Sequence, residues 1–163
     1  MVDTEWVDEW HRVMTGHLAG LVETFEETHG YPPGENTVVP AHRDTRAAAA
    51  RLAKQWPAFE PLLPLYEVVG SASLEDVDHA YFIHSPATVT QHLSEYGHVD
   101  LADGRTGIVF ASDGGGHLYA LADDGRVEKS RTASWSDDFA EVSEDIGDFL
   151  GQLLHVVRQF AGP

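Results

Sequence analysis

Residues 107–130 have the sequence GIVFASDGGGHLYALADDGRVEKS, and this stretch decides the fold class. It contains three strand-like runs, which are Gly107–Ser112, His117–Ala122 and Arg126–Ser130. Two turn sequences separate these runs, Asp113-Gly114-Gly115-Gly116 and Asp123-Asp124-Gly125. Both turns are typical of hairpins, because glycine adopts positive φ without strain. The stretch therefore predicts three consecutive antiparallel strands.

Segments on both sides of this meander extend the sheet and cover it. Ala80–His84 is expected to form a short buried strand, and Phe139–Val142, with Trp135 before it, one more edge strand. Helices are expected over 4–29, over 42–56, from Ser85-Pro86 to Gly97, and over about 144–160 with Ser143 as the N-cap. This order indicates an α+β fold, a single mostly antiparallel sheet covered by helices.

Two segments leave alternatives open. Pro61–Val69 suits either a short buried helix or a strand, and we prefer the helix. Tyr31-Pro32-Pro33-Gly34 begins a linker of about ten residues toward Pro40. We expect a single domain over 1–163, in which residues 1–39, the long N-terminal helix and the linker, either pack on the rest or form an appendage.

The composition narrows the class of protein. The chain has 163 residues, no cysteine, and no apolar run near the length of roughly 18 residues that spans a bilayer. Without cysteine, disulfides and thiolate metal sites are excluded. The N-terminus, Met1-Val2-Asp3-Thr4-Glu5, is acidic where a signal peptide would be basic, which predicts a cytoplasmic protein.

The charge is strongly negative along the whole chain. Lys and Arg total 10 against 27 Asp and Glu, a formal net charge of −17 at pH 7. Such a polyanion repels phosphate backbones and anionic membranes, so we predict no direct binding to nucleic acid or membrane. Basic protein partners are attracted, although solubility alone is the simpler explanation of an acidic surface.

The residue patterns predict no catalytic residue, metal or cofactor. Metal-ligand spacing is absent among four histidines near the predicted sheet, which are His79, His84, His98 and His117. His84-Ser85 is not expected to form a nucleophile–base pair, since neighbours in a strand point to opposite faces and Ser85 suits a helix cap. The three glycines could bring a partner or an anion close to bare backbone, but a hairpin turn explains them more simply.

The first predicted helix carries two further features. Trp6 and Trp10 suit either an interface anchor or the inward apolar stripe, and their spacing favours the stripe. Gly16 and Gly20 weaken the helix, which suggests a close helix approach there, for example between two copies of the chain. The oligomeric state stays open.

Three pieces of the chain carry a family resemblance. They are Leu74–His84 (LEDVDHAYFIH), Ile108–Gly116 followed by Leu118–Leu121, and the terminal helix with Asp148-Phe149-Leu150 and Leu153-Leu154. Together they resemble the SUKH superfamily, whose founding branch is a fungal cell-wall synthesis regulator. The resemblance covers about half of the chain, and His117 stands where members often carry Asn.

The resemblance implies a non-catalytic α+β binding fold, used in bacteria chiefly as immunity proteins that neutralise toxins, many of them nucleases. Together with the net charge, it predicts an immunity protein for a basic nuclease-type toxin. The candidate partner-binding residues are Asp76, Asp78, Asp113, Gly114, Gly115, Gly116, Asp123, Asp124, Asp137 and Asp138. The alternatives are a regulatory or scaffolding domain for a housekeeping protein, as in the fungal branch, and a small-molecule-binding protein.

Overall fold

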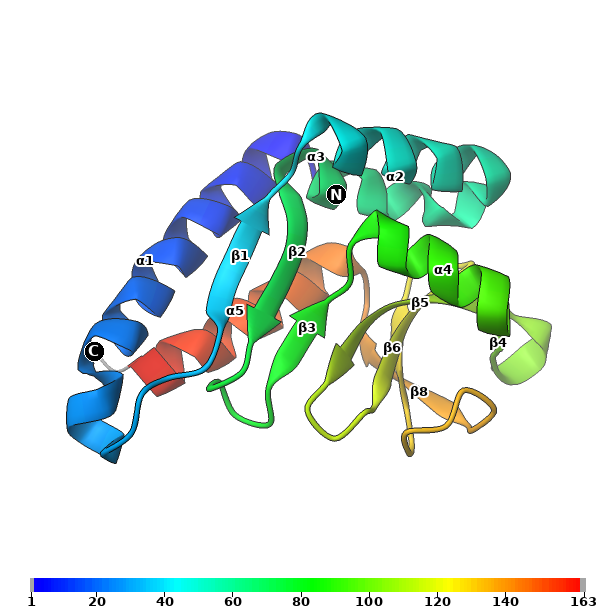
Figure 1. Ribbon diagram of the computed structural model, residues 1–163. Helices are drawn as coiled ribbons and strands as arrows, with labels where there is room; N and C mark the ends of the chain where they lie inside the picture. The colour runs from blue at the N-terminus through cyan, green and yellow to red at the C-terminus, as the bar shows by residue number, and fades with distance from the viewer. Residues whose placement is uncertain (1, 162–163) are drawn as a thin grey trace.

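Residues 2–161 are described by the computed structural model, and they form one antiparallel sheet with helices packed around it (Figure 1). The helices are α1 (Thr4–His29), α2 (Arg43–Gln55), α3 (Leu63–Val68), α4 (Pro86–Tyr96) and α5 (Ile146–Ala161), with the 3₁₀ helices η1 (Pro57–Leu62) and η2 (Ala102–Gly104). The strands are β1 (Asn36–Pro40), β2 (Val69–Leu74), β3 (Tyr81–Ile83), β4 (Val99–Asp100), β5 (Thr106–Asp113), β6 (Leu118–Ala122), β7 (Val127–Ser130) and β8 (Phe139–Ser143). The predicted α+β class is confirmed.

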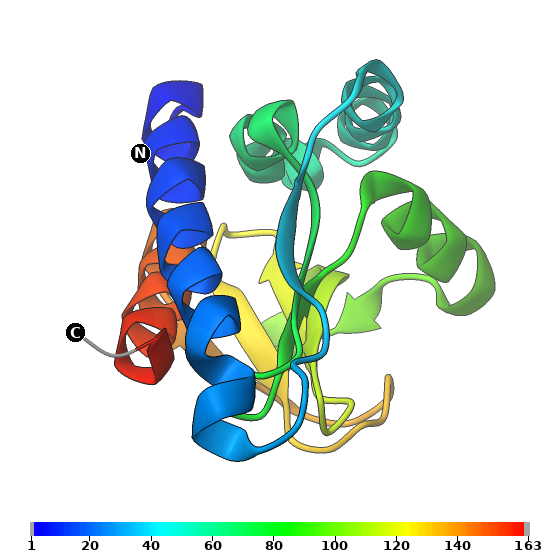
Figure 2. The same cartoon turned by 60° about the vertical axis from the view of Figure 1, so that its left-hand side comes forward.

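The sheet is built around the meander that the sequence predicts. Within residues 2–161 its order is β1-β2-β3-β5-β6-β7-β8, with β4 paired to β5 off this path. Ile108 of β5 lies opposite Leu121 of β6, and Leu121 lies opposite Val127 of β7, so the three predicted strands pair as expected. Figure 2 shows α1 and α5 on one side of the sheet and α4 on the other.

The predicted linker after α1 is wrong in its second half. Asn36–Pro40 forms the edge strand β1, which pairs with β2 from Asn36 opposite Leu74 to Pro40 opposite Val69. This pairing buries Val38. Pro32 and Pro33 precede β1 and are typical of a linker rather than a strand. The partner strand β2 follows α2, η1 and α3 in the chain. A local pattern therefore could not reveal the pairing.

The ambiguous segment Pro61–Val69 is divided among three elements. Its first residues finish η1, Leu63–Val68 forms α3 as the preferred interpretation expects, and Val69 begins β2. β2 was not predicted, because Pro61–Val69 was expected to form a single element. A Cβ at Gly70 would come within 3.1 Å of the Pro40 carbonyl oxygen, so this glycine permits the close approach of β1 and β2.

Asp145, rather than the predicted Ser143, caps the first turn of α5. Ser143 ends β8 opposite Val127, and its buried Oγ has no hydrogen-bond partner among the described residues. The Asp145 carboxylate accepts a hydrogen bond from the Asp148 amide at 2.8 Å, and the Asp145 carbonyl accepts one from the Phe149 amide at 3.1 Å. Pairing of Ser143 in the strand leaves the capping position to Asp145.

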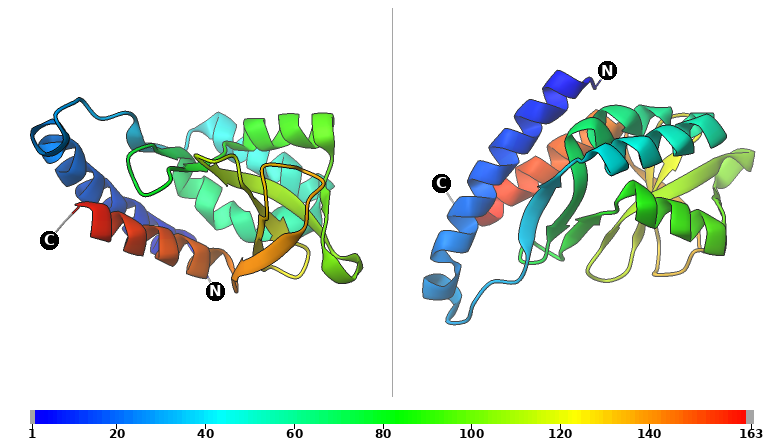
Figure 3. Two further views of the ribbon diagram at one scale, coloured as in Figure 1. Left: turned by 90° about the horizontal axis from the view of Figure 1, so that it is seen from below. Right: turned by 45° about the horizontal axis from the view of Figure 1, so that its top comes forward.

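The helix α1 is docked on the rest of the chain. Its buried side chains include Val7, Trp10 and Met14, which belong to the same core cluster as residues of α5 and the sheet. The Trp10 indole Nε1 donates to the Leu150 carbonyl oxygen at 2.8 Å. Figure 3 shows α1 and α5 running side by side. The connection after α1 leads into β1, which pairs with β2. This connection is therefore fixed at one end by the docked helix and at the other end by the sheet.

The tryptophans and glycines of α1 have different surroundings from those expected. Trp10 is buried, whereas Trp6 is 40% exposed, so the inward-stripe interpretation is confirmed for Trp10 and wrong for Trp6. A Cβ at Gly16 or Gly20 would meet no atom within 4 Å. These glycines therefore do not serve a close helix approach within the chain.

Trp10→Ala is expected to lower the free energy of unfolding by about 3–5 kcal/mol, because it empties a core position and removes the hydrogen bond to Leu150. Trp6→Ala, the matched control in the same helix, is expected to lower it by less than about 1 kcal/mol. Urea unfolding of both variants measures the difference. Equal losses would contradict the docked position of α1.

Candidate functional site

The predicted partner-binding residues do not form one patch. Most lie on the β2–β3, β5–β6 and β7–β8 connections, along the lower edge of the sheet in Figure 1; these are Asp76, Asp78, Asp113, Gly114, Gly115, Gly116, Asp137 and Asp138. Asp123 and Asp124 lie in the β6–β7 turn, at the opposite end of the strands. Hairpin connections alternate between the two ends of an antiparallel sheet, which explains the separation.

Asp76 ties β1 to the β2–β3 connection. Its carboxylate accepts hydrogen bonds from the Gly34 amide and from the Asn36 side-chain amide, both at 2.7 Å. The Asn36 Oδ1 accepts in return from the Asp76 amide at 3.0 Å. These bonds give Asp76 a structural role, since they hold the edge strand that the sequence interpretation missed.

Asp113 organises the glycine loop from a buried position. Its Oδ1 accepts from the amides of Gly115 and His117 at 3.0 and 2.9 Å, and lies 3.1 Å from His117 Nδ1. Its Oδ2 lies 3.3 Å from Lys129 Nζ. Burial disfavours the charged carboxylate, but the bonds from His117 and Lys129 outweigh burial and hold the Asp113 pKa below its usual value.

The glycines of this loop are explained by the hairpin turn and its neighbours. A Cβ at Gly114 would lie 2.1 Å from the His79 carbonyl oxygen, to which the Gly114 amide donates at 2.9 Å. Gly116 has a φ of 83°, in the left-handed region that favours glycine. The close approach that bare backbone permits is therefore made to the β2–β3 connection of the same chain.

Asp78 and Asp137, two further acids of the lower edge, also accept hydrogen bonds within the chain. The Tyr81 hydroxyl donates to Asp78 at 2.8 Å, and the Thr132 hydroxyl donates to Asp137 at 2.6 Å. The Asp138 amide adds a bond to Asp137 at 2.7 Å. The bonds from Thr132 and Asp138 hold the Asp137 pKa below its usual value. The carboxylates of Asp76, Asp113 and Asp137 thus stabilise the backbone of the loops at the lower edge.

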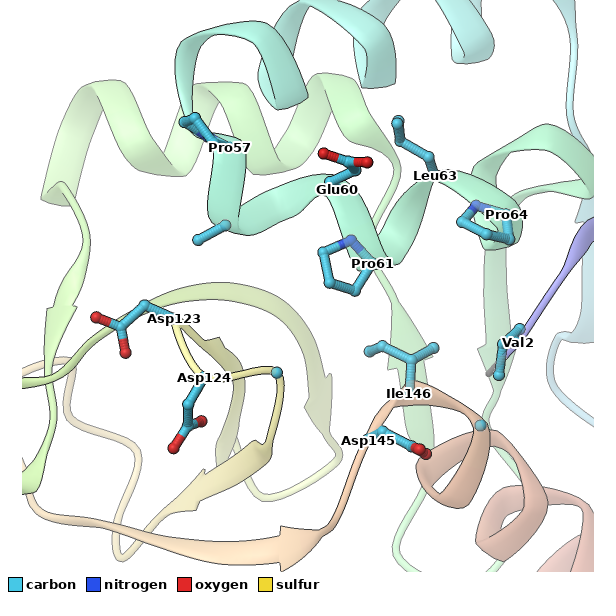
Figure 4. Close-up of a pocket in the computed structure, with 13 residues that line it drawn as sticks. Val2, Pro57, Glu60, Pro61, Leu63, Pro64, Asp123, Asp124, Asp145 and Ile146 are labelled. Atoms are coloured by element: carbon cyan, nitrogen blue, oxygen red, sulfur yellow. The ribbon is translucent and has the colours of Figure 1, made fainter.

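A groove of about 900 Å³ opens at the opposite end of the sheet, beside Asp123 and Asp124 (Figure 4). Three segments that are far apart in the sequence enclose it, namely η1 with the start of α3, the β6–β7 turn, and the first residues of α5. Val2 also lines it. Its volume lies near the upper end of the range for small-ligand pockets, so it has room for several side chains.

The wall formed by η1 and α3 is apolar and poor in hydrogen-bond donors. Pro57, Pro61 and Pro64 line this wall together with Leu63. The prolines recur at intervals of four and three residues, which places them on one side of a helical segment. Ile146 extends from the start of α5 toward Pro61 (Figure 4). Because proline has no backbone N–H, these three residues present apolar rings and no backbone hydrogen-bond donor to the groove.

Carboxylates surround this apolar wall, and they come from Glu60, Asp123, Asp124 and Asp145. Arg105 approaches the rim, with its guanidinium 3.4 Å from Asp124, but it also pairs with the buried Glu128. Arg126 lies 3.9 Å from Asp124 and closer, at 3.0 Å, to Glu141. Since Glu128 and Glu141 take up the positive charge of these arginines, the rim keeps a negative charge.

Carboxylates are the ionisable groups that the described residues bring to the groove. Apart from the rim carboxylates, no lining residue of the described chain carries a nucleophile, an imidazole or a cation. Carboxylates beside an apolar wall complement a positively charged group that has apolar neighbours. The groove is therefore our candidate functional site.

A serine–histidine pair lies elsewhere in the structure, next to α4. His84 Nε2 lies 2.9 Å from Ser112 Oγ, while the buried His84 Nδ1 has no hydrogen-bond partner in the described chain. Burial and, after it, the neighbouring His92 lower the pKa of His84 to about 4. This imidazole is a weak base at neutral pH and lacks the orienting carboxylate of a catalytic triad. As predicted, Ser85 caps α4, and its Oγ accepts from the Thr88 amide at 3.2 Å.

Two further features of residues 2–161 concern metal and membrane binding. No group of three or more His, Asp or Glu side chains in this range is placed to hold a metal ion. None of the helices described is both long enough and apolar enough to cross a membrane.

Comparisons with known proteins found no matching family model, no matching curated protein and no matching solved structure. The sequence interpretation named Asp123 and Asp124 but missed the rest of the groove. The signal lay in residues 57–64, PAFEPLLP, where prolines recur at helical spacing.

Gly114→Ala is expected to lower the free energy of unfolding by about 1–3 kcal/mol, because the new methyl group would overlap the His79 carbonyl. Gly16→Ala, placed in open space on α1, is the control and is expected to raise it by about 0.5–1 kcal/mol. Urea unfolding checks both signs. A neutral effect at Gly114 would show that the β2–β3 connection does not approach this loop.

The low pKa of His84 predicts a loss of stability in acid. Between about 6.5, the ordinary value, and about 4, the unfolded chain binds a proton that the folded chain does not. The free energy of unfolding is therefore expected to decrease as the pH falls through this window. His84→Gln keeps a donor for Ser112 and is expected to make the decrease smaller. Urea unfolding across this pH range tests it, and an unchanged slope in the variant would refute the buried neutral imidazole.

Proposed function

We propose that this protein is a non-catalytic immunity protein of the cytoplasm, which binds and neutralises a basic, nuclease-type toxin. The groove carries the proposal, because it combines an apolar wall with a rim of carboxylates. The formal net charge of −17 supports a positively charged partner. The resemblance of Leu74–Leu154 to the SUKH superfamily supports the same function from the sequence.

Charge and apolar contact contribute at different stages of such an interaction. Attraction between an acidic protein and a basic toxin raises the association rate, toward about 10⁸ M⁻¹s⁻¹ at low salt. Apolar side chains that are buried in the centre of the interface slow dissociation, and they supply most of the affinity. A nuclease must present cations to the phosphates of its substrate, so a protein with carboxylates at its binding surface competes for the same groups.

Co-expression with nuclease toxins encoded beside its gene tests this function. We expect the protein to restore the growth of cells that produce one of these toxins and to co-purify with that toxin. The association rate is expected to fall steeply as salt is raised, because the attraction between the partners is screened. Failure to protect against every neighbouring toxin, or protection without a physical complex, would overturn the proposal. A complex with a housekeeping protein would favour a scaffolding role instead.

A further inference from the structure

We infer that the groove between η1, the β6–β7 turn and the start of α5 binds a short segment of the partner in which an apolar side chain lies between arginine or lysine side chains. This inference rests on the proposed function, and it deepens that function by stating which surface meets the toxin and with what chemistry. The lower edge of the sheet, where most of the predicted binding residues lie, is then outside the central contact.

The centre of the groove calls for an apolar side chain. Pro61 extends from η1 toward the buried Ile146 on the opposite wall, and Pro64 continues the apolar surface toward Val2 (Figure 4). Pro61 is exposed in the isolated protein, so a partner that covers it removes apolar surface from water. A purely polar segment would leave that surface without a matching contact.

The rim carboxylates would be complemented by positive charges in the partner segment on both sides of its apolar side chain. Asp123 and Asp124 lie on the β6–β7 turn, Glu60 lies on η1 across the groove, and Asp145 precedes α5 (Figure 4). Cations on both sides of a central apolar residue would then each lie beside a part of the groove that carries a carboxylate. Lysine and arginine also carry aliphatic stems that pack on apolar walls while the charge stays in water.

The start of α5 does not reverse this preference. A helix N-terminus carries about half a positive charge, which on its own would favour an anion. Here the Asp145 carboxylate already accepts from the Asp148 amide, and the Asp148 carboxylate accepts from the Glu144 amide at 3.0 Å. The side chains of Asp145 and Asp148 thus add negative charge at the place where an anion would have to bind. The net preference is for a cation.

Short labelled peptides of alternating arginine and leucine are the probe, with three matched controls that replace arginine by glutamate, arginine by serine, or leucine by serine. Fluorescence anisotropy at low salt measures affinity for the full chain. We expect the arginine–leucine peptide to bind more tightly than every control. Amide resonances of Gly125, Asp145 and Gly147 are expected to shift as it is added.

Two groove variants locate the binding. Glu60→Gln with Asp123→Asn removes two rim charges and is expected to weaken binding about 3- to 10-fold. Pro61→Arg places a cation in the centre of the groove and is expected to weaken it at least as much. The matched controls on the exposed side of α1, Glu23→Gln with Glu27→Gln and Ala19→Arg, make the same charge changes elsewhere and are expected to alter affinity less than about twofold. Circular dichroism checks that each variant folds.

The inference is overturned if the arginine–leucine peptide does not bind, if the glutamate peptide binds equally well, or if the charge-removing groove variant binds like wild type. Resonance shifts confined to the lower edge of the sheet would overturn it as well. If Pro61→Arg does not fold, the Glu60 and Asp123 variant still decides the question. If the groove variants still protect cells against a toxin, the groove is not the binding site, but the proposed function stands. If the peptide binds in the groove and the protein protects against no toxin, the groove is a binding site, but the proposed function is wrong.

Discussion

Burial of one face of β5 and β6 is the constraint on which the rest of the structure depends. Phe110 and Tyr119 project from this face, and both pack against Phe149 of α5. The Phe149 ring centroid lies 5.4 Å from that of Phe110 and 5.3 Å from that of Tyr119. The apolar surface of α5 is wider than the part that packs on the sheet. α1 covers the remaining part with Trp10 and the neighbouring buried side chains. The first residues of α5 are thereby fixed beside the β6–β7 turn, where they form part of the groove.

The acidic residues that carry most of the bonds at the lower edge differ in exposure from those that line the groove. At the lower edge of the sheet, Asp76, Asp113 and Asp137 each accept hydrogen bonds from backbone amides of nearby loops, which makes them part of the fold. At the groove, the carboxylates of Asp124 and Asp145 also accept backbone hydrogen bonds, but Glu60, Asp123, Asp124 and Asp145 are all exposed. Net charge alone therefore does not indicate which carboxylates are available to a partner, because the fold decides how far each one is exposed.

The sequence was most informative where structure depends on neighbouring residues. The turns at Asp113–Gly116 and Asp123–Gly125 carry their own conformational requirement, so the strands on either side of them were predicted correctly. The long helices were predicted for the same reason, since apolar spacing and a closing Gly30 are local signals. β1 and β2 were missed, because Val38 and Ala72 become strand residues only by pairing with each other across an intervening helical region.

The sequence by itself determined the α+β class, the hairpin meander, the helices that enclose it, and the negative charge of the surface. Each of these follows from composition or from contacts between residues close in the chain. The tertiary structure alone decided that α1 docks on α5, that Ser143 pairs in β8 while Asp145 caps α5, and that residues near 60, 124 and 146 enclose a groove. Those features need segments that are distant in sequence to meet in space, and that meeting is set by burial of the shared core.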